Sequence, residues 1–285
     1  MPDHRFTQDT IALIYDFDGT LSPKSMQDYT LLPKIGIEET AFWREVEIEV
    51  NQTGADGMLV YMRLLLEKAQ QRNIHIRRDD YKRLAKHIEY FPGVEQWFDL
   101  IGQHVQQHNP NIKLKHYIIS AGMREILEGV SIRHHFARIF ASEYHFNHDG
   151  VADFPNRVIT DTSKTQYLFR INKGREETHQ SINDHMEEAE RPIPFSNIIY
   201  IGDGMTDVPC MALTRRQSGH AIAVYRADHS DGQAICKNLL HAGRVDFIAQ
   251  ADYSQNSELY HRTVLLLNAV MANIEYQREL FYCRQ

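Results

Sequence analysis

Short apolar runs alternate along most of the chain with longer segments in which apolar residues recur every three or four positions. The short runs are bounded by turn residues, so they predict strands. We expect strands at 11–15, 115–120, 138–142, 197–203, 220–224 and 245–249. The helical spacing predicts helices at 95–107, 123–130, 164–173, 205–213, between the last two strands, and at 257–274. Strands that alternate with helices predict a parallel sheet covered on both faces, which is an α/β fold.

One stretch breaks this alternation directly after the first strand. Residues 24–90 carry helical spacing and few strand signals, and we expect four helices there, separated by Gly36, Gly54 and Gly57. The economical interpretation is a small helical domain, residues 22–91, inserted into an α/β core made of residues 1–21 and 92–285.

The composition of the 285 residues is that of a globular protein, with 42% hydrophobic and 24% charged residues. It excludes disorder, collagen and coiled coil as descriptions of the whole chain. The net charge of −7 argues against a surface that coats DNA or RNA. It leaves an anionic small molecule possible, because a metal or a lysine can reverse the field within one cleft.

Membrane and export signals are missing from the pattern. The longest apolar runs have five residues, and the start MPDHRFTQDT is polar. Cys210, Cys236 and Cys283 are too far apart to predict a CxxC site or a disulfide framework. We therefore expect a protein of the reducing cytoplasm. For His134 and His135 we expect surface or packing roles rather than metal binding, and for the acidic stretch 176–190 an exposed helix or loop.

The first candidate site is Asp16-Phe17-Asp18-Gly19-Thr20, directly after the first strand. Carboxylates two residues apart on an extended chain point to the same side, and Gly19 permits a tight turn. Such a pair suits a cation site, or a nucleophile beside an acid/base. An Asp-rich turn is the plainer alternative.

Two further candidates follow at the ends of later elements. Ser120 closes a predicted strand ahead of Ala121, Gly122 and a helix, where a hydroxyl and backbone N–H groups could bind phosphate oxygens. A helix N-cap is the more common role of such a serine. Lys164 stands at a predicted helix start, where the helix dipole disfavours it, so a bound anion would explain it. Taken alone, Lys164 is more simply a solvated lysine.

The fourth candidate, Gly202-Asp203-Gly204-Met205-Thr206-Asp207, follows the apolar strand 197–201. It offers two carboxylates on a loop that enters a helix. Asp207 could instead be an ordinary residue of the first helical turn, where the helix dipole favours negative charge. Ligands of open α/β sheets bind beyond the carboxyl ends of the strands, and all four candidates lie at such ends or at helix starts. Their order along the chain is more informative than any one of them.

In this order the four motifs resemble those of the haloacid dehalogenase (HAD) superfamily of phosphohydrolases. DFDGTL is similar to its first motif, the run ending in Ser120 to the second, Lys164 to the third and GDGMTD to the fourth. The resemblance covers residues 1–21 and about 92–250. It implies a Rossmann-like core, and it makes the inserted helices similar to a C1-type cap. The layout is most similar to the phosphoserine phosphatase-like branch.

The resemblance also implies roles for the residues. Asp16 would be the nucleophile that forms an aspartyl-phosphate, and Asp18 the general acid and base. Mg²⁺ would be held by the Asp16 carboxylate, the Asp18 carbonyl and Asp203, with Asp207 as a further ligand or as a group that orients one. The remaining implied contacts are with phosphoryl oxygens, from Ser120, Lys164 and the backbone near Asp18, Gly19 and Ala121. The implied partner is a small soluble phosphomonoester.

Several alternatives stay open. A dehalogenase would not need Asp18, and a P-type ATPase would show DKTGT and membrane helices, but a phosphomutase or phosphotransferase would use the same pair of carboxylates. A catalytically silent binding protein with the same fold is a further alternative. Phosphoserine phosphatase-like enzymes usually carry a Glu soon after the first motif, whereas LSPKSMQDY has Lys24 and Gln27 and no Glu. Candidates for substrate contact in the insertion, each of which could equally serve packing or solvation, are Phe42, Trp43, Arg44, Tyr61 and Arg63.

Overall fold

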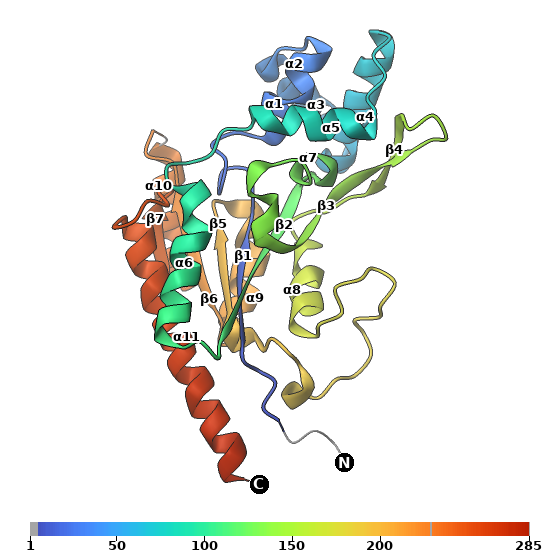
Figure 1. Ribbon diagram of the computed structural model, residues 1–285. Helices are drawn as coiled ribbons and strands as arrows, with labels where there is room; N and C mark the ends of the chain where they lie inside the picture. Colours follow the sequence, from blue (N-terminus) through green and yellow to red (C-terminus); the bar gives the residue numbers. More distant parts are fainter. Residues whose placement is uncertain (1–4, 229, 285) are drawn as a thin grey trace.

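The computed structural model describes residues 5–228 and 230–284, which build one seven-stranded sheet in the order β4-β3-β2-β1-β5-β6-β7 (Figure 1). All neighbouring strands are parallel except β3 and β4. The α/β fold class is therefore as the pattern predicted. The strands are β1 Thr10–Tyr15, β2 Lys113–Met123, β3 Phe136–Phe146, β4 Ala152–Arg157, β5 Ile198–Gly202, β6 His220–Tyr225 and β7 Phe247–Gln250.

Helices cover both faces of this sheet, as a sheet buried on both sides requires. One face packs against α6 (Val94–His108) and α11 (Glu258–Cys283). The other packs against α8 (Lys164–Asn172), α9 (Val208–Arg216) and α10 (Ser230–His241). In β1, Ile11 and Leu13 join the first layer, whereas Ala12 and Ile14 join the second, because successive side chains of a strand point to opposite faces.

The inserted helices lie over the carboxyl ends of the central strands (Figure 1). The four expected helices are present as α2 to α5, and a one-turn helix, α1, precedes them. Gly36 and Gly54 end α2 and α3 in the left-handed conformation, whereas Gly57 is the first residue of α4. The bounds are α1 Met26–Tyr29, α2 Leu31–Ile35, α3 Glu39–Thr53, α4 Gly57–Gln71 and α5 Arg78–Leu84, followed by a 3₁₀ turn, Ala85–His87.

The strand β4 was not predicted. It pairs antiparallel with β3 at the sheet edge, and most of its side chains are exposed or half-exposed. Its polar sequence ADFPNR, with Pro155 inside it, carries no buried-strand signal, since edge strands tolerate proline and polar residues. The β3–β4 hairpin reaches the inserted helices, where the Ala152 N–H donates to the Ile76 carbonyl at 3.1 Å.

Other differences from the predicted elements concern lengths. The helix expected at 123–130 is one turn, α7 (Arg124–Leu127), and α11 runs nine residues beyond the expected end at Ile274. The acidic stretch 176–190 is an exposed loop with one 3₁₀ turn, as expected. All three cysteines are free, and the rings of His134 and His135 contact each other at a tilted angle in a 3₁₀ turn.

Within the part of the chain that the structure describes, no helix is both long enough and apolar enough to cross a membrane.

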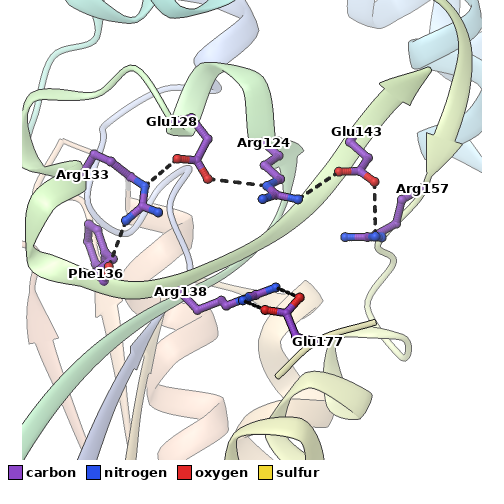
Figure 2. A network of polar contacts seen from close by, with 8 residues as sticks. All are labelled: Arg124, Glu128, Arg133, Phe136, Arg138, Glu143, Arg157 and Glu177. Carbon is purple, nitrogen blue, oxygen red and sulfur yellow. Dashed lines mark hydrogen bonds and ion pairs between the residues drawn. The ribbon is translucent and has the colours of Figure 1, made fainter. Parts of the chain in front are cut away.

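Arginine–glutamate pairs connect α7 to the neighbouring strands (Figure 2). Arg124, at the start of α7, bonds Glu143 of β3 at 3.3 Å, and Arg157 of β4 bonds the same carboxylate at 3.2 Å. Glu128 pairs with Arg133 at 2.6 Å. The groups are partly exposed, so each pair contributes about 0–1 kcal/mol.

Candidate active site

Four of the sequence candidates meet beneath the inserted helices. Asp16 follows β1, and Asp203 and Asp207 follow the adjacent strand β5, so parallel pairing brings their backbones together. The Asp16 N–H donates to the Ile201 carbonyl at 3.0 Å, which continues this pairing past the end of β1. Lys164 begins α8, on the side of the sheet that packs against α9. The site thus forms at the carboxyl ends of the strands.

Lys164 is buried, and it joins two carboxylates. Its Nζ lies 3.0 Å from Asp16 Oδ1 and 2.8 Å from Asp207 Oδ1. Tyr200 of β5 donates its hydroxyl to the same Asp207 oxygen at 2.7 Å. The side chain of Lys164 is only 1% exposed, so the interpretation of this residue as a solvated lysine is wrong.

The electrostatics of the cluster are dominated by burial. Burial raises the pKa of Asp16 to about 6, against the opposing charge of Lys164. Burial, followed by the charges of Asp16 and Asp207, raises the pKa of Asp203 well above its usual range. Burial disfavours the Lys164 ammonium, but Asp16 and Asp207 outweigh this effect and raise the pKa of Lys164 above its ordinary value. The cluster therefore has more negative groups than Lys164 can balance.

The residues fit a divalent cation. Asp16, Asp203 and Asp207 each offer an oxygen, and these atoms lie within 4.8 Å of one another. Asp207 Oδ2 is buried without a hydrogen-bond partner among the described residues. Hard cations such as Mg²⁺ prefer carboxylate oxygens, and positive charge would relieve the repulsion that raises these pKa values.

Only glycine fits at position 19 without displacing its neighbours. Its φ is +80°, which favours glycine, and a Cβ there would lie 2.1 Å from Asp203 Oδ2. The first motif and the fourth motif thus touch at this position, and a side chain at 19 would displace a candidate metal ligand.

Asp18 is separate from the three-carboxylate cluster. Its Oδ1 accepts a hydrogen bond at 2.9 Å from the backbone N–H of Met26, the first residue of α1. Burial, and then the charge of Asp16, raise the pKa of Asp18 well above its usual range. A raised pKa favours the protonated carboxyl, which is the form that a general acid needs.

Ser120 and Ala121 lie inside β2, which continues to Met123 rather than ending at Ser120. Ser120 is 1% exposed, and its Oγ accepts a hydrogen bond from Gly122 N–H at 2.9 Å. The N-cap of α7 is Met123, so Ser120 is not a helix cap. Gly122 approaches Asp18, because a Cβ at 122 would lie 3.2 Å from Asp18 Oδ2.

Two cavities flank Asp18 between the inserted helices and the core. One, of about 590 Å³, is bordered by Gly19, Asp203 and Arg226, and the other, of about 610 Å³, by Gln27, Ala121 and Gly122. Asp18, Ser25 and Trp43 border both. Both are large enough for a small organic molecule.

Of the five candidates for substrate contact, two border a cavity beside Asp18 and three do not. Trp43 and Tyr61 border the cavity beside Ala121, whereas Phe42 is fully buried in the core. Arg63 pairs with Glu49 and Glu67, and the exposed Arg44 lies away from Asp18.

The sequence reasoning missed Tyr200, Met26 and, as a cavity residue, Gln27. In the sequence, Tyr200 is one more apolar residue of a strand, because no neighbouring residue indicates that its hydroxyl bonds Asp207. Met26 acts through its backbone N–H and carries no side-chain signal. Gln27 had a signal, since a polar residue at the buried face of a short helix stands out once that face is known.

Known proteins resemble this chain over much of its length. The family model of haloacid dehalogenase-like hydrolases matches residues 13–212. An uncharacterized protein of Borreliella burgdorferi is 27% identical in an alignment of 276 positions that covers 89% of this chain and 95% of that protein.

Solved structures share the fold at low identity. A phosphoserine phosphatase solved as a phospho-aspartyl intermediate analogue has a TM-score of 0.55 and 15% identity, covering 90% of this chain and 98% of that one. A probable phosphoserine phosphatase from Vibrio cholerae has a TM-score of 0.57 and 11% identity, covering 97% and 69%. The match to the family model spans more than half of the sequence, and with the fold it shows that this chain belongs to the haloacid dehalogenase-like hydrolases.

Proposed function

We propose that the protein is a Mg²⁺-dependent phosphatase that hydrolyses a small phosphomonoester through an aspartyl-phosphate on Asp16. The observation that carries this proposal is that two neighbouring carboxylates, Asp16 and Asp18, lie in different surroundings. Asp16 lies in the cluster with Lys164 and the other aspartates, whereas Asp18 lies outside it, with its carboxyl held by Met26. Membership of the hydrolase family and the phosphatases among its structural neighbours support the reaction class.

In the first step, an Asp16 carboxylate oxygen attacks the phosphorus and the bond from phosphorus to the ester oxygen breaks. The leaving oxygen takes the proton of the Asp18 carboxyl, so the alcohol departs neutral. The pKa of Asp18, which burial raises, favours the protonated carboxyl at the start of this step.

In the second step, water attacks the phosphorus and gives a proton to the Asp18 carboxylate. The bond from phosphorus to Asp16 breaks, which releases inorganic phosphate and restores both side chains. Lys164 balances charge at Asp16 throughout. The backbone of Ala121 and Gly122 borders the cavity beside Asp18, and together with the neighbouring Ser120 it would bind the phosphoryl oxygens.

Asp16, Asp203 and Asp207 would hold the cation, with the Asp18 carbonyl as a further ligand. Bound there, Mg²⁺ supplies positive charge to the phosphoryl oxygens. The fit of these residues supports the assignment of the metal, since an excess of buried carboxylates needs a counterion.

The inserted helices support a small substrate. They border both cavities beside Asp18, and cavities of about 600 Å³ suit a metabolite better than a folded phosphoprotein. We propose that residues 22–91 form a cap domain over the site.

The test uses the purified full chain and p-nitrophenyl phosphate, with Mg²⁺ or with excess EDTA. We expect activity with Mg²⁺, loss with EDTA, and no turnover or phospho-enzyme for Asp16→Asn. The matched control is Asp149→Asn, an exposed aspartate on the β3–β4 hairpin, which should keep wild-type activity. Release of one phosphate per alcohol distinguishes hydrolysis from a phosphomutase or phosphotransferase. Full activity of Asp16→Asn, or after exhaustive chelation, would contradict the proposal.

A further inference from the structure

The cavity beside Ala121 and Gly122 is bordered by acidic residues. Three carboxyl groups border it, from Asp18, Asp56 and Asp161, and among residues 5–228 and 230–284 no Lys, Arg or His does so. Because this cavity also contains the backbone next to Ser120, the alcohol part of a phosphomonoester bound there would extend into it. A second anionic group on that alcohol would meet only carboxylates.

A buried amide in this cavity has an unused acceptor. Gln27 of α1 is 3% exposed, and its Nε2 donates to the Tyr61 hydroxyl at 3.2 Å. Its Oε1 has no hydrogen-bond partner among the described residues. A buried acceptor without a partner is costly, so a ligand that brings an N–H donor would stabilise it.

Two aromatic rings border the same cavity. Trp43 of α3 and Tyr61 of α4 have ring centroids 5.7 Å apart. Trp43 donates its Nε1–H to Asp28 at 2.9 Å, which fixes the orientation of its ring. Tryptophan and tyrosine faces attract cations, and quaternary ammonium ligands are commonly bound in this way.

The neighbouring cavity, beside Gly19, differs in charge. It is bordered by Lys24 and Arg226, and both already have partners, in Glu39 at 3.5 Å and in Asp228 at 2.7 Å. The lining also contains five acidic residues, so an anionic group on a ligand would find cations there, and a cationic group would find carboxylates. The two cavities therefore differ in what they would select.

We propose that the cavity bordered by Gln27, Trp43 and Tyr61 selects phosphomonoesters whose alcohol carries a positively charged ammonium group. The inference rests on the phosphatase activity proposed above and specifies its substrate class. Asp56 and Asp161 provide the negative charge, the aromatic pair provides the cation contact, and Gln27 Oε1 provides an acceptor for an ammonium N–H. Phosphoserine fits less well, because its carboxylate has no cation to meet in this cavity.

The first experiment compares substrates that differ in charge but hardly in shape. Choline phosphate and 3,3-dimethylbutyl phosphate share a size, and only the first is cationic. We expect kcat/KM to be higher for choline phosphate by roughly tenfold, and ethanolamine phosphate to exceed phosphoserine by at least as much. Equal kcat/KM for the charged and neutral pair would overturn the proposal.

The second experiment removes the acceptor. Gln27→Leu should lower kcat/KM for ethanolamine phosphate by roughly tenfold while p-nitrophenyl phosphate stays within about twofold. The matched control is Gln70→Leu, the same change at an exposed position of α4, which should alter neither substrate. Thermal unfolding identifies a variant that fails to fold, and the comparison of substrates on the wild type does not depend on it.

The two proposals fail in different ways. Hydrolysis of p-nitrophenyl phosphate without discrimination between the charged and neutral esters refutes the ammonium site and leaves the phosphatase. If no ester is hydrolysed, the phosphatase proposal fails, and calorimetry on the wild type with choline and 3,3-dimethylbutan-1-ol then tests the site directly. Preferential binding of choline would support it, and equal or absent binding of both alcohols would refute it.

Discussion

The Nζ of Lys164 lies 2.8 Å from Oδ1 of Asp207, and both side chains are withdrawn from solvent, with 1% and 0% exposed. The same ammonium lies 3.0 Å from Asp16. A single lysine thus holds a carboxylate of the first motif and one of the fourth motif in place. The arrangement is strongly coupled, because a charge removed from it leaves its partners buried and unpaired.

Replacement of Lys164 should therefore affect both folding and activity. We expect Lys164→Met to lower the free energy of unfolding by about 3–5 kcal/mol, since two buried carboxylates lose their counterion. Urea unfolding measures this, and phosphatase activity should be lost in parallel. The double variant Lys164→Met/Asp207→Asn should recover part of the stability. A free energy of unfolding for Lys164→Met within about 1 kcal/mol of the wild-type value would show that the contacts of Lys164 with the two carboxylates contribute little to stability.

Gly19 and Gly36 form a matched pair for testing the metal site. Their φ values are +80° and +73°, so alanine costs about 1–2 kcal/mol of backbone strain at either position. At Gly36 no described atom lies within 4 Å of the added Cβ, whereas at Gly19 Asp203 Oδ2 lies 2.1 Å away. Gly19→Ala should therefore reduce the increase in Tm caused by Mg²⁺, and Gly36→Ala should keep it. An equal Mg²⁺ response in both variants would argue against Asp203 as a ligand.

Asp18→Asn should separate the two chemical steps. Asparagine cannot transfer the proton, so turnover of an alkyl phosphate should fall by about 10²–10⁴. The first step with p-nitrophenyl phosphate should suffer less, because p-nitrophenolate leaves without protonation. Rapid-quench kinetics should then show a burst of p-nitrophenol and an accumulating phospho-enzyme. Wild-type turnover of alkyl phosphates by this variant would exclude Asp18 as the acid.

His116 should make the protein less stable in mild acid. Its Nδ1 lies within hydrogen-bond distance, 3.1 Å, of the Tyr15 hydroxyl, and this hydroxyl accepts a hydrogen bond from Trp97 Nε1–H. Burial, and then His135, lower the pKa of His116 to about 3. The unfolded chain takes up this proton near pH 6.5, so stability falls as the pH falls from 6.5 towards 3.

The size of this effect is measurable by urea unfolding at pH 7 and pH 5. From His116 alone we expect a loss of about 2 kcal/mol between these values. His116→Asn keeps a hydrogen-bond acceptor and should lose less stability over this interval. The control His148→Asn, at an exposed position, should behave as the wild type. An identical loss in His116→Asn and the wild type would mean that His116 does not titrate as described.

Local pattern determined the parallel strands, because they are buried on both faces and must be apolar over their whole length. The inserted helices were equally visible from their spacing. The edge strand β4 was not, since an exposed strand needs no apolar pattern and owes its structure to hydrogen bonds with β3. The last turns of α11 are largely exposed and likewise carry no apolar pattern.

The residue types that could carry the chemistry are visible in the amino-acid sequence. Asp16, Asp18, Asp203 and Asp207 stand out because turn-rich motifs follow apolar strands. Their separation into two groups depends on the folded chain, since the pairing of β1 with β5 places Asp16 against Asp203 and Asp207, while α1 holds Asp18 apart.

Lys164, Tyr200 and Gln27 depended on the fold in the same way. A lysine, a tyrosine and a glutamine are ordinary residues in a sequence, and their burial gives them importance. Burial and partners are properties of segments brought together from positions as distant as 16, 164 and 207. No local pattern encodes such a contact, because its energy arises only when the chain has excluded water from all three side chains at once.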